Sequence, residues 1–182
     1  MVDFTQNEKD DLLALARDAI DTKLKGKTVA VAEQLSEALQ TAAGVFVTLH
    51  KKGKLRGCIG TFQADFPLYK QVIKMAQASA FEDIRFSSVR LSELKDIDIE
   101  ISVLSPLREI ESIAEIVIGK HGIYITQGFH RGVLLPQVAT DHGWDRETFL
   151  QHTCMKAGLP MDAWQKGTKI EIFSATILGE KD

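Results

Sequence analysis

The sequence has little of what marks several special classes of protein. Its 182 residues contain two cysteines, Cys58 and Cys154, which are too few and too far apart for a disulfide scaffold. No apolar run approaches the roughly 18 residues that a membrane-crossing helix needs. The acidic, polar residues 1–11 lack the basic and apolar regions of a secretory signal. We therefore expect a soluble, cytoplasmic chain whose two cysteines remain thiols.

The sequence also lacks an excess of positive charge. It has 22 lysines and arginines against 25 aspartates and glutamates, a formal net charge of −3. Proteins that neutralise nucleic-acid phosphates usually carry a basic excess, so general nucleic-acid binding is disfavoured. The one basic cluster, Lys51, Lys52, Lys54 and Arg56, could still hold a single anionic group.

Motifs for metals and cofactors are missing as well. None of the five histidines has the HxxxH or HExxH spacing of paired metal ligands, so we expect no metal site. The chain has no P-loop, no dinucleotide-binding glycine pattern and no serine nucleophile elbow. The sequence accordingly predicts no cofactor.

The apolar periodicity predicts an α+β fold. Thr5 and Glu8 form a capping-box pattern that starts a helix, and the run IDIEISVL over residues 97–104 alternates as a strand does. Helices are expected at 5–26, at 31–40 (closed by Gly44), at 67–81 and at 146–157. Strands are expected at 45–50, 55–62, 97–104, 123–126, 133–138 and 169–178. Helices first, then strands mixed with helices, favour a mostly antiparallel sheet with flanking helices. Without a linker-like segment, we expect a single domain over residues 1–182.

The most chemically loaded segment is the run LRGCIG, residues 55–60. In a strand, Arg56, Cys58 and Gly60 share one face, which places a guanidinium and a thiol two positions apart. A nearby cation lowers the pKa of a thiol, and glycines let a ligand or another backbone approach closely. Cys58 is therefore either a nucleophilic or ligand-holding group with Arg56 as its anion partner, or a small buried cysteine packed tightly between glycines.

Three further residues are candidates with ordinary alternatives. Glu100 lies on the polar face of the 97–104 strand, where it either faces water or accepts a proton in a cleft. His152 borders the apolar stripe of the 146–157 helix and is either a boundary residue or a general base. Arg131, in a glycine-framed turn, is either solvated or offers a planar fork to a carboxylate or phosphate.

Several runs together resemble the AMMECR-type domain family. They are GVFVTL at 44–49, LRGCIG at 55–60, PLY at 67–69, IEISVLSP at 99–106, HRGVLLPQVA at 130–139, HGWDRETFL at 142–150 and KAGLP at 156–160. The family's DPRFPPL-like run reads DIRFSSV at 83–89, which puts the rigidity of that loop in doubt. The resemblance implies two unequal lobes sharing a cleft near the hexapeptide, functional roles for Arg56, Gly57, Cys58 and Gly60, and no established activity. It also implies Memo-type and radical-SAM partners, as in the AmmeMemoRadiSam system.

Two functions follow as hypotheses. In the first, the chain is an enzyme or enzyme component that uses Cys58 on a small anionic or acyl-type substrate. Arg56 would then stabilise charge, and Glu100 or His152 would handle protons, while Gly57, Gly60 and Arg131 would contact the substrate. In the second, the hexapeptide shapes the surface of a non-catalytic protein-interaction module.

Overall fold

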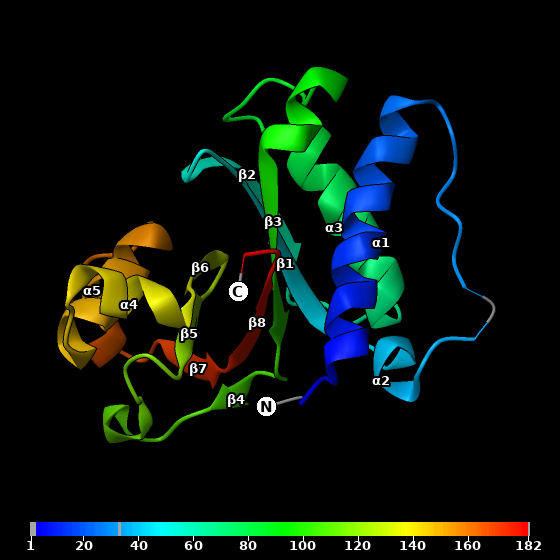
Figure 1. The fold of residues 1–182 in the computed structure, drawn as a ribbon. Helices are drawn as coiled ribbons and strands as arrows, with labels where there is room; N and C mark the ends of the chain where they lie inside the picture. The colour runs from blue at the N-terminus through cyan, green and yellow to red at the C-terminus, as the bar shows by residue number, and fades with distance from the viewer. Residues whose placement is uncertain (1–2, 33, 182) are drawn as a thin grey trace. The chain divides into compact units, whose positions relative to one another are not determined.

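The computed structural model describes residues 3–32 and 34–181, which form two compact units (Figure 1). The large unit holds residues 3–104 and 176–181, and the small unit holds residues 105–175. Each unit has its own four-stranded sheet and its own buried core. The strand pairs with a described register are antiparallel, and the expected α+β class is confirmed. None of the helices in the described part of the chain is long and apolar enough to span a bilayer.

The large unit packs helices against one face of its sheet. Its helices are α1 (Gln6–Leu24), α2 (Glu37–Gln40), α3 (Leu68–Phe81) and the 3-10 helix η1 (Leu91–Asp96). Its strands are β1 (Gly44–Lys51), β2 (Lys54–Thr61), β3 (Ile97–Leu104) and β8 (Ala175–Gly179), in the order β2-β1-β3-β8. Figure 1 shows α1 and α3 side by side along this sheet. Val47 and Leu49 of β1 and Ile99 and Ile101 of β3 are buried in the core. The alternate residues of these strands therefore lie on the opposite, open face.

The first helix follows the prediction, and the second does not. The Thr5 side chain accepts a hydrogen bond from the Glu8 N–H, and the Glu8 carboxylate accepts one from the Thr5 N–H. The prediction of a helix at 31–40 was wrong, because only Glu37–Gln40 is helical. Ser36 caps that short helix, and Gly44 begins β1 instead of closing a helix. An alanine-rich composition favours a helix only where a stripe of apolar residues can also be buried.

The β1–β2 hairpin carries the hexapeptide and contains a bulge. Cys58 pairs with Thr48, and Gly57 pairs with Leu49, but His50 pairs with Leu55. Arg56 is therefore an extra residue on β2. A bulge re-aims side chains, so the predicted alternation holds from Gly57 onward and is interrupted at Arg56.

The small unit builds a second sheet covered by α5. Its strands are β4 (Arg108–Glu109), β5 (Gly122–Gln127), β6 (His130–Leu134) and β7 (Lys169–Phe173), in the order β4-β7-β5-β6. Its helices are α4 (Pro136–His142), α5 (Arg146–Lys156) and the 3-10 helices η2 (Ile113–Glu115) and η3 (Ala163–Gln165). Phe149, Leu150 and Cys154 of α5 are fully buried in this core. The Asp145 side chain caps α5 by accepting from the Thr148 N–H at 2.8 Å, as the sequence indicated.

Two predicted strands had wrong bounds. The strand expected at 133–138 ends at Leu134, because Pro136 begins α4, where a proline fits the first turn. The strand expected at 169–178 is two strands, β7 and β8, which belong to different sheets. They separate at Ser174, whose carbonyl accepts from the Ser105 N–H and whose N–H donates to Ser105 Oγ, each at 2.9 Å. Continuous apolar alternation cannot reveal such a change of sheet.

Candidate functional site around Cys58

The glycines beside Cys58 allow close packing within the large unit. A Cβ on Gly57 would lie 2.2 Å from the backbone oxygen of Ser79 in α3. The buried Ser79 hydroxyl accepts from the Ile59 N–H at 2.9 Å and donates to the Val47 carbonyl at 2.7 Å, so it bridges β2 and β1. A Cβ on Gly60 would lie 2.2 Å from the ring of Phe46. Another backbone and an aromatic ring thus fill the space beside the two glycines, and a role for them in substrate binding stays a prediction.

The peptide groups of Cys58 are held by a buried aspartate and an arginine. The Cys58 N–H donates to Asp83 Oδ2 at 2.9 Å, and Arg85 Nη2 donates to the Cys58 carbonyl at 3.1 Å. The same arginine forms a fork on Asp83, with Nε to Oδ1 at 2.9 Å and Nη2 to Oδ2 at 2.7 Å. The Asp83 side chain is only 3% exposed, whereas that of Arg85 is 53% exposed. The hydrogen bonds from Arg85 hold the pKa of Asp83 well below its usual range. Cys58 therefore sits on a backbone fixed from both sides.

The Cys58 side chain is half-buried on the open face of the sheet. Its Sγ accepts a hydrogen bond from Thr48 Oγ1 at 3.3 Å. Thr48 pairs with Cys58 in β2 and with Glu100 in β3, so these three residues form a row across neighbouring strands. Directly opposed residues of an antiparallel pair have Cβ atoms about 5 Å apart. The register thus places a hydroxyl between a thiol and a carboxylate.

Arg56 has a different partner from the one the sequence suggested. Its guanidinium donates to both oxygens of Glu93, at 3.3 and 3.1 Å, and Lys51 Nζ bonds the same carboxylate at 2.7 Å. The two cations, Arg56 first, lower the pKa of Glu93 to about 2. The prediction that Arg56 faces the thiol is corrected here, because the bulge re-aims it toward η1. The cation bonded to the Cys58 backbone is Arg85.

Sequence reasoning thus missed Asp83 and Arg85 as site residues. The run DIRFSSV was recognised only as a variant loop. Its Asp-x-Arg spacing was the available signal, because an aspartate can bind a backbone or side chain two residues on. Nothing local indicates that the carboxylate becomes buried against a strand 25 residues away.

The remaining predicted residues belong to the small unit. His152 stacks on Trp144 with ring centroids 3.9 Å apart, and His142 stacks on the same indole at 4.7 Å. Arg131 lies in β6 and is exposed. Cys154 is fully buried, and burial raises the pKa of its thiol. Participation of His152 and Arg131 in chemistry at Cys58 stays a prediction.

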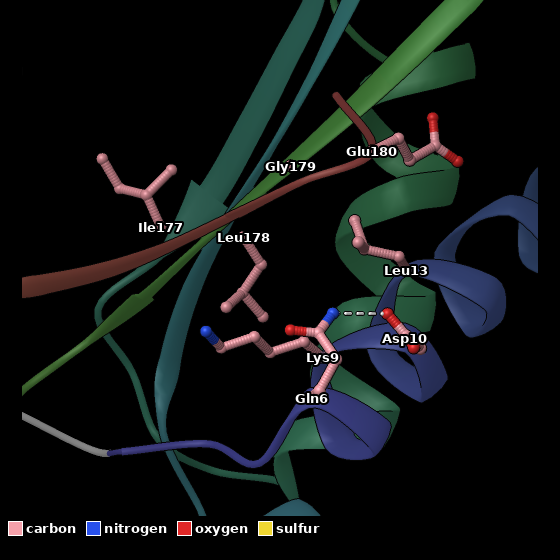
Figure 2. A pocket seen from close by; sticks show the side chains of 8 residues that line it. All are labelled: Gln6, Lys9, Asp10, Leu13, Ile177, Leu178, Gly179 and Glu180. Carbon is pink, nitrogen blue, oxygen red and sulfur yellow. Dashed lines mark hydrogen bonds between the residues drawn. The ribbon is translucent and has the colours of Figure 1, made fainter. Parts of the chain in front are cut away.

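Two hollows border β8 in the large unit. The first, of about 430 Å³, lies between the start of α1 and β8 (Figure 2). Figure 2 shows Ile177 pointing away from Leu178, as alternation along a strand requires. Three of its polar side chains already have partners, because Gln6 donates to Asp10 at 2.9 Å and Glu180 pairs with Arg17 at 2.6 Å.

The second hollow, of about 260 Å³, shares one lining residue, Glu100, with the Cys58 row. His50, Asp98 and Lys181 are also among the residues that line it. Lys181 forms an ion pair with Asp98. Among the described residues, no group of three or more histidine, cysteine or carboxylate side chains is arranged to hold a metal ion.

Comparison with known proteins agrees with this architecture. A family model described as AMMECR1 matches residues 13–178. A protein of Methanothermobacter thermautotrophicus is 44% identical, over 97% of this chain and 96% of its own. A protein of Thermococcus onnurineus is 43% identical, over 93% of this chain and 89% of its own. The crystal structure of the uncharacterised protein PH0010 from Pyrococcus horikoshii superposes with a TM-score of 0.90 at 39% identity, covering 96% of this chain and 92% of that one. The chain belongs to the AMMECR1 family.

Proposed function

We propose that this AMMECR1-family protein is an enzyme, or a component of one, that uses the Cys58 thiol on a small acyl-type or anionic substrate. The observation that carries the proposal is the support around Cys58. Asp83 and Arg85 fix its peptide groups on both sides, while its half-buried Sγ accepts a hydrogen bond from Thr48. A reactive group must be held by rigid surroundings to reach a substrate in a productive geometry.

The chemistry would be nucleophilic acyl transfer. The sulfur of Cys58 would attack the carbonyl carbon of the substrate, forming a carbon–sulfur bond as the bond to the leaving group breaks. The thiol proton would pass to a neighbouring base and then to the leaving group, with Glu100, the carboxylate on the far side of Thr48, facing the base as it becomes positive. Arg85, half exposed beside Cys58, would attract an anionic substrate. His152 and Arg131 remain proposed contributors from the small unit.

The test compares the two cysteines of the folded protein. We expect iodoacetamide to alkylate Cys58 at least about tenfold faster than buried Cys154 at pH 7, as followed by mass spectrometry. A panel of small thioesters should leave an acyl group on Cys58 that the Cys58→Ala variant does not form. A folded protein in which Cys58 reacts as slowly as Cys154 would contradict the proposal.

A second function is favoured by one exposed apolar side chain. Ile84 is fully exposed between Asp83 and Arg85, at the loop that holds Cys58. We propose it as one contact of a protein-interaction module that docks Memo-type or radical-SAM partners in the cytoplasm. For this function, Ile84→Ser should weaken binding to a purified partner and leave alkylation of Cys58 unchanged. Equal binding by Ile84→Ser and the unmodified protein would contradict it.

A further inference from the structure

We propose that His50 takes the proton of the Cys58 thiol, and that the hollow lined by His50 and Glu100 holds part of the substrate. The inference rests on the proposed thiol chemistry and names a residue and a subsite for it. His50 follows Thr48 by two positions in β1, so both side chains lie on the open face of the sheet with Cys58. Asp98 of β3 pairs directly with His50. Three neighbouring strands thus present a thiol, an imidazole and a carboxylate on one face.

The register brings the imidazole within reach of the sulfur. Cys58 pairs with Thr48, so His50 is its diagonal neighbour across the β1–β2 pair. Diagonal neighbours in an antiparallel pair have Cα atoms about 7–8 Å apart, which long side chains can span. Catalytic hydrogen bonds are often long or poorly aligned before a substrate binds, and the proposal requires that the ring of His50 turn toward the sulfur when it does.

The bulge places Leu55, instead of Arg56, opposite His50 on the open face of the sheet. Without the register shift at Leu49/His50, Arg56 would lie on the open face next to Cys58. The shift turns Arg56 instead to Glu93 of η1, where its side chain is only 12% exposed. η1 lies on the helix side of the sheet, because Arg17 of α1 donates to the Leu94 carbonyl at 3.0 Å. The bulge thus removes a bulky cation that would compete with His50 for the sulfur.

The charges around the hollow suit an imidazole that becomes positive. Asp98 and Glu100 face it from β3, and Glu180 and Lys181 face it from the chain after β8. Lys181 pairs with Asp98, and Glu180 pairs with Arg17 on the α1 side. Asp98, directly opposite His50 in β3, would face the ring when it takes a proton.

The proposed step is balanced within the site. The S–H bond of Cys58 breaks, its proton binds a ring nitrogen of His50, and the thiolate keeps the electron pair. When the sulfur attacks an acyl substrate, His50 returns the proton to the leaving group. The hollow of about 260 Å³ is large enough for a small polar acyl compound.

The experiment measures the rate of Cys58 alkylation by iodoacetamide between pH 5 and pH 10 in His50→Gln. The matched control is His142→Gln, at an exposed histidine of the small unit. At pH 7 we expect His50→Gln to react about tenfold more slowly than the unmodified protein, with equal rates at pH 10, where thiols ionise without help. Buried Cys154 reacts slowly only while the protein is folded, so its alkylation rate reports the folding of each variant.

A second variant tests the hollow itself. His50→Ala should be as slow at pH 7 as His50→Gln, and free imidazole should restore its rate by entering the vacated space. Full reactivity of Cys58 with an unchanged pH profile in His50→Gln would overturn this inference and leave the thiol proposal standing. A Cys58 that is already unreactive in the unmodified protein would overturn both.

Discussion

Replacing Asp83 with asparagine should destabilise the large unit through the loss of one buried carboxylate. Oδ1 accepts from the Arg85 N–H and Nε, and Oδ2 accepts from the Cys58 N–H and Arg85 Nη2. An asparagine keeps one of these oxygens and turns the other into an NH₂ donor. The two N–H groups that bonded to the replaced oxygen would then face the new NH₂ group, which is also a donor. Water is largely excluded from this site and could not separate them.

The expected cost is about 3 kcal/mol. Removing one partner of a buried ion pair typically costs 3–5 kcal/mol. The lower end applies because the Arg85 side chain is 53% exposed, which lets water solvate the guanidinium. For a chain of this length, about 3 kcal/mol corresponds to a fall of roughly 6–12 °C in Tm.

The pH dependence supplies a second signature. The pKa of Asp83 in the folded protein lies below its ordinary value, so the carboxylate contributes stability above that ordinary value. This contribution to stability disappears as the pH falls from the ordinary pKa of an aspartate toward the lower pKa that Asp83 has in the folded protein. The difference in stability between the unmodified protein and Asp83→Asn should therefore be full at pH 7 and shrink below about pH 4.

The assay is urea denaturation followed by circular dichroism at pH 7 and pH 3, with Asp65→Asn as the control. Asp65 is exposed and makes the same change of charge. If Asp83→Asn costs no more than Asp65→Asn, or costs the same at pH 3 as at pH 7, the reasoning about this clamp is refuted.

Other predictions concern packing and a second carboxylate that is held by cations. Gly57→Ala should lose about 1–3 kcal/mol by overpacking against the Ser79 carbonyl, whereas Ser79→Ala should lose a similar amount by leaving strand groups unpaired. Thermal unfolding measures both losses, with Ser87→Ala at an exposed position as the neutral control. An unchanged Tm in Gly57→Ala would contradict the close approach of Gly57 to the Ser79 carbonyl. Glu93→Gln should cost about 2–3 kcal/mol at pH 7, because the pKa of Glu93 falls from the ordinary 4.5 to about 2 on folding. The ionised carboxylate therefore stabilises the folded protein above pH 4.5. This contribution is lost as the pH falls from 4.5 toward 2. Glu82→Gln, at an exposed pair, should cost under about 1 kcal/mol, and equal costs for the two glutamates would count against the ion pairs of Glu93.

The sequence determined those features that depend on neighbours along the chain. The Thr5–Glu8 capping box, the β3 strand at Ile97–Leu104 and the Asp145 cap of α5 all follow from interactions or periodicities within a few residues. Cys58 was singled out for the same reason, because its glycine neighbours and its arginine lie within one strand. The runs shared with the AMMECR-type family also sufficed to predict the family, which the comparisons confirm.

Only the tertiary structure decided which groups surround Cys58. Asp83 is 25 residues from Cys58 along the chain and Glu93 is 37 residues from Arg56, and a one-residue bulge chose between two orientations of that arginine. The register also set His50 opposite Asp98 and Thr48 between Cys58 and Glu100. Strand pairing and the burial of charged groups depend on distant segments that come together only when the core forms. Local patterns therefore indicate the strands and the thiol, whereas folding determines which cation and which polar side chains lie beside it.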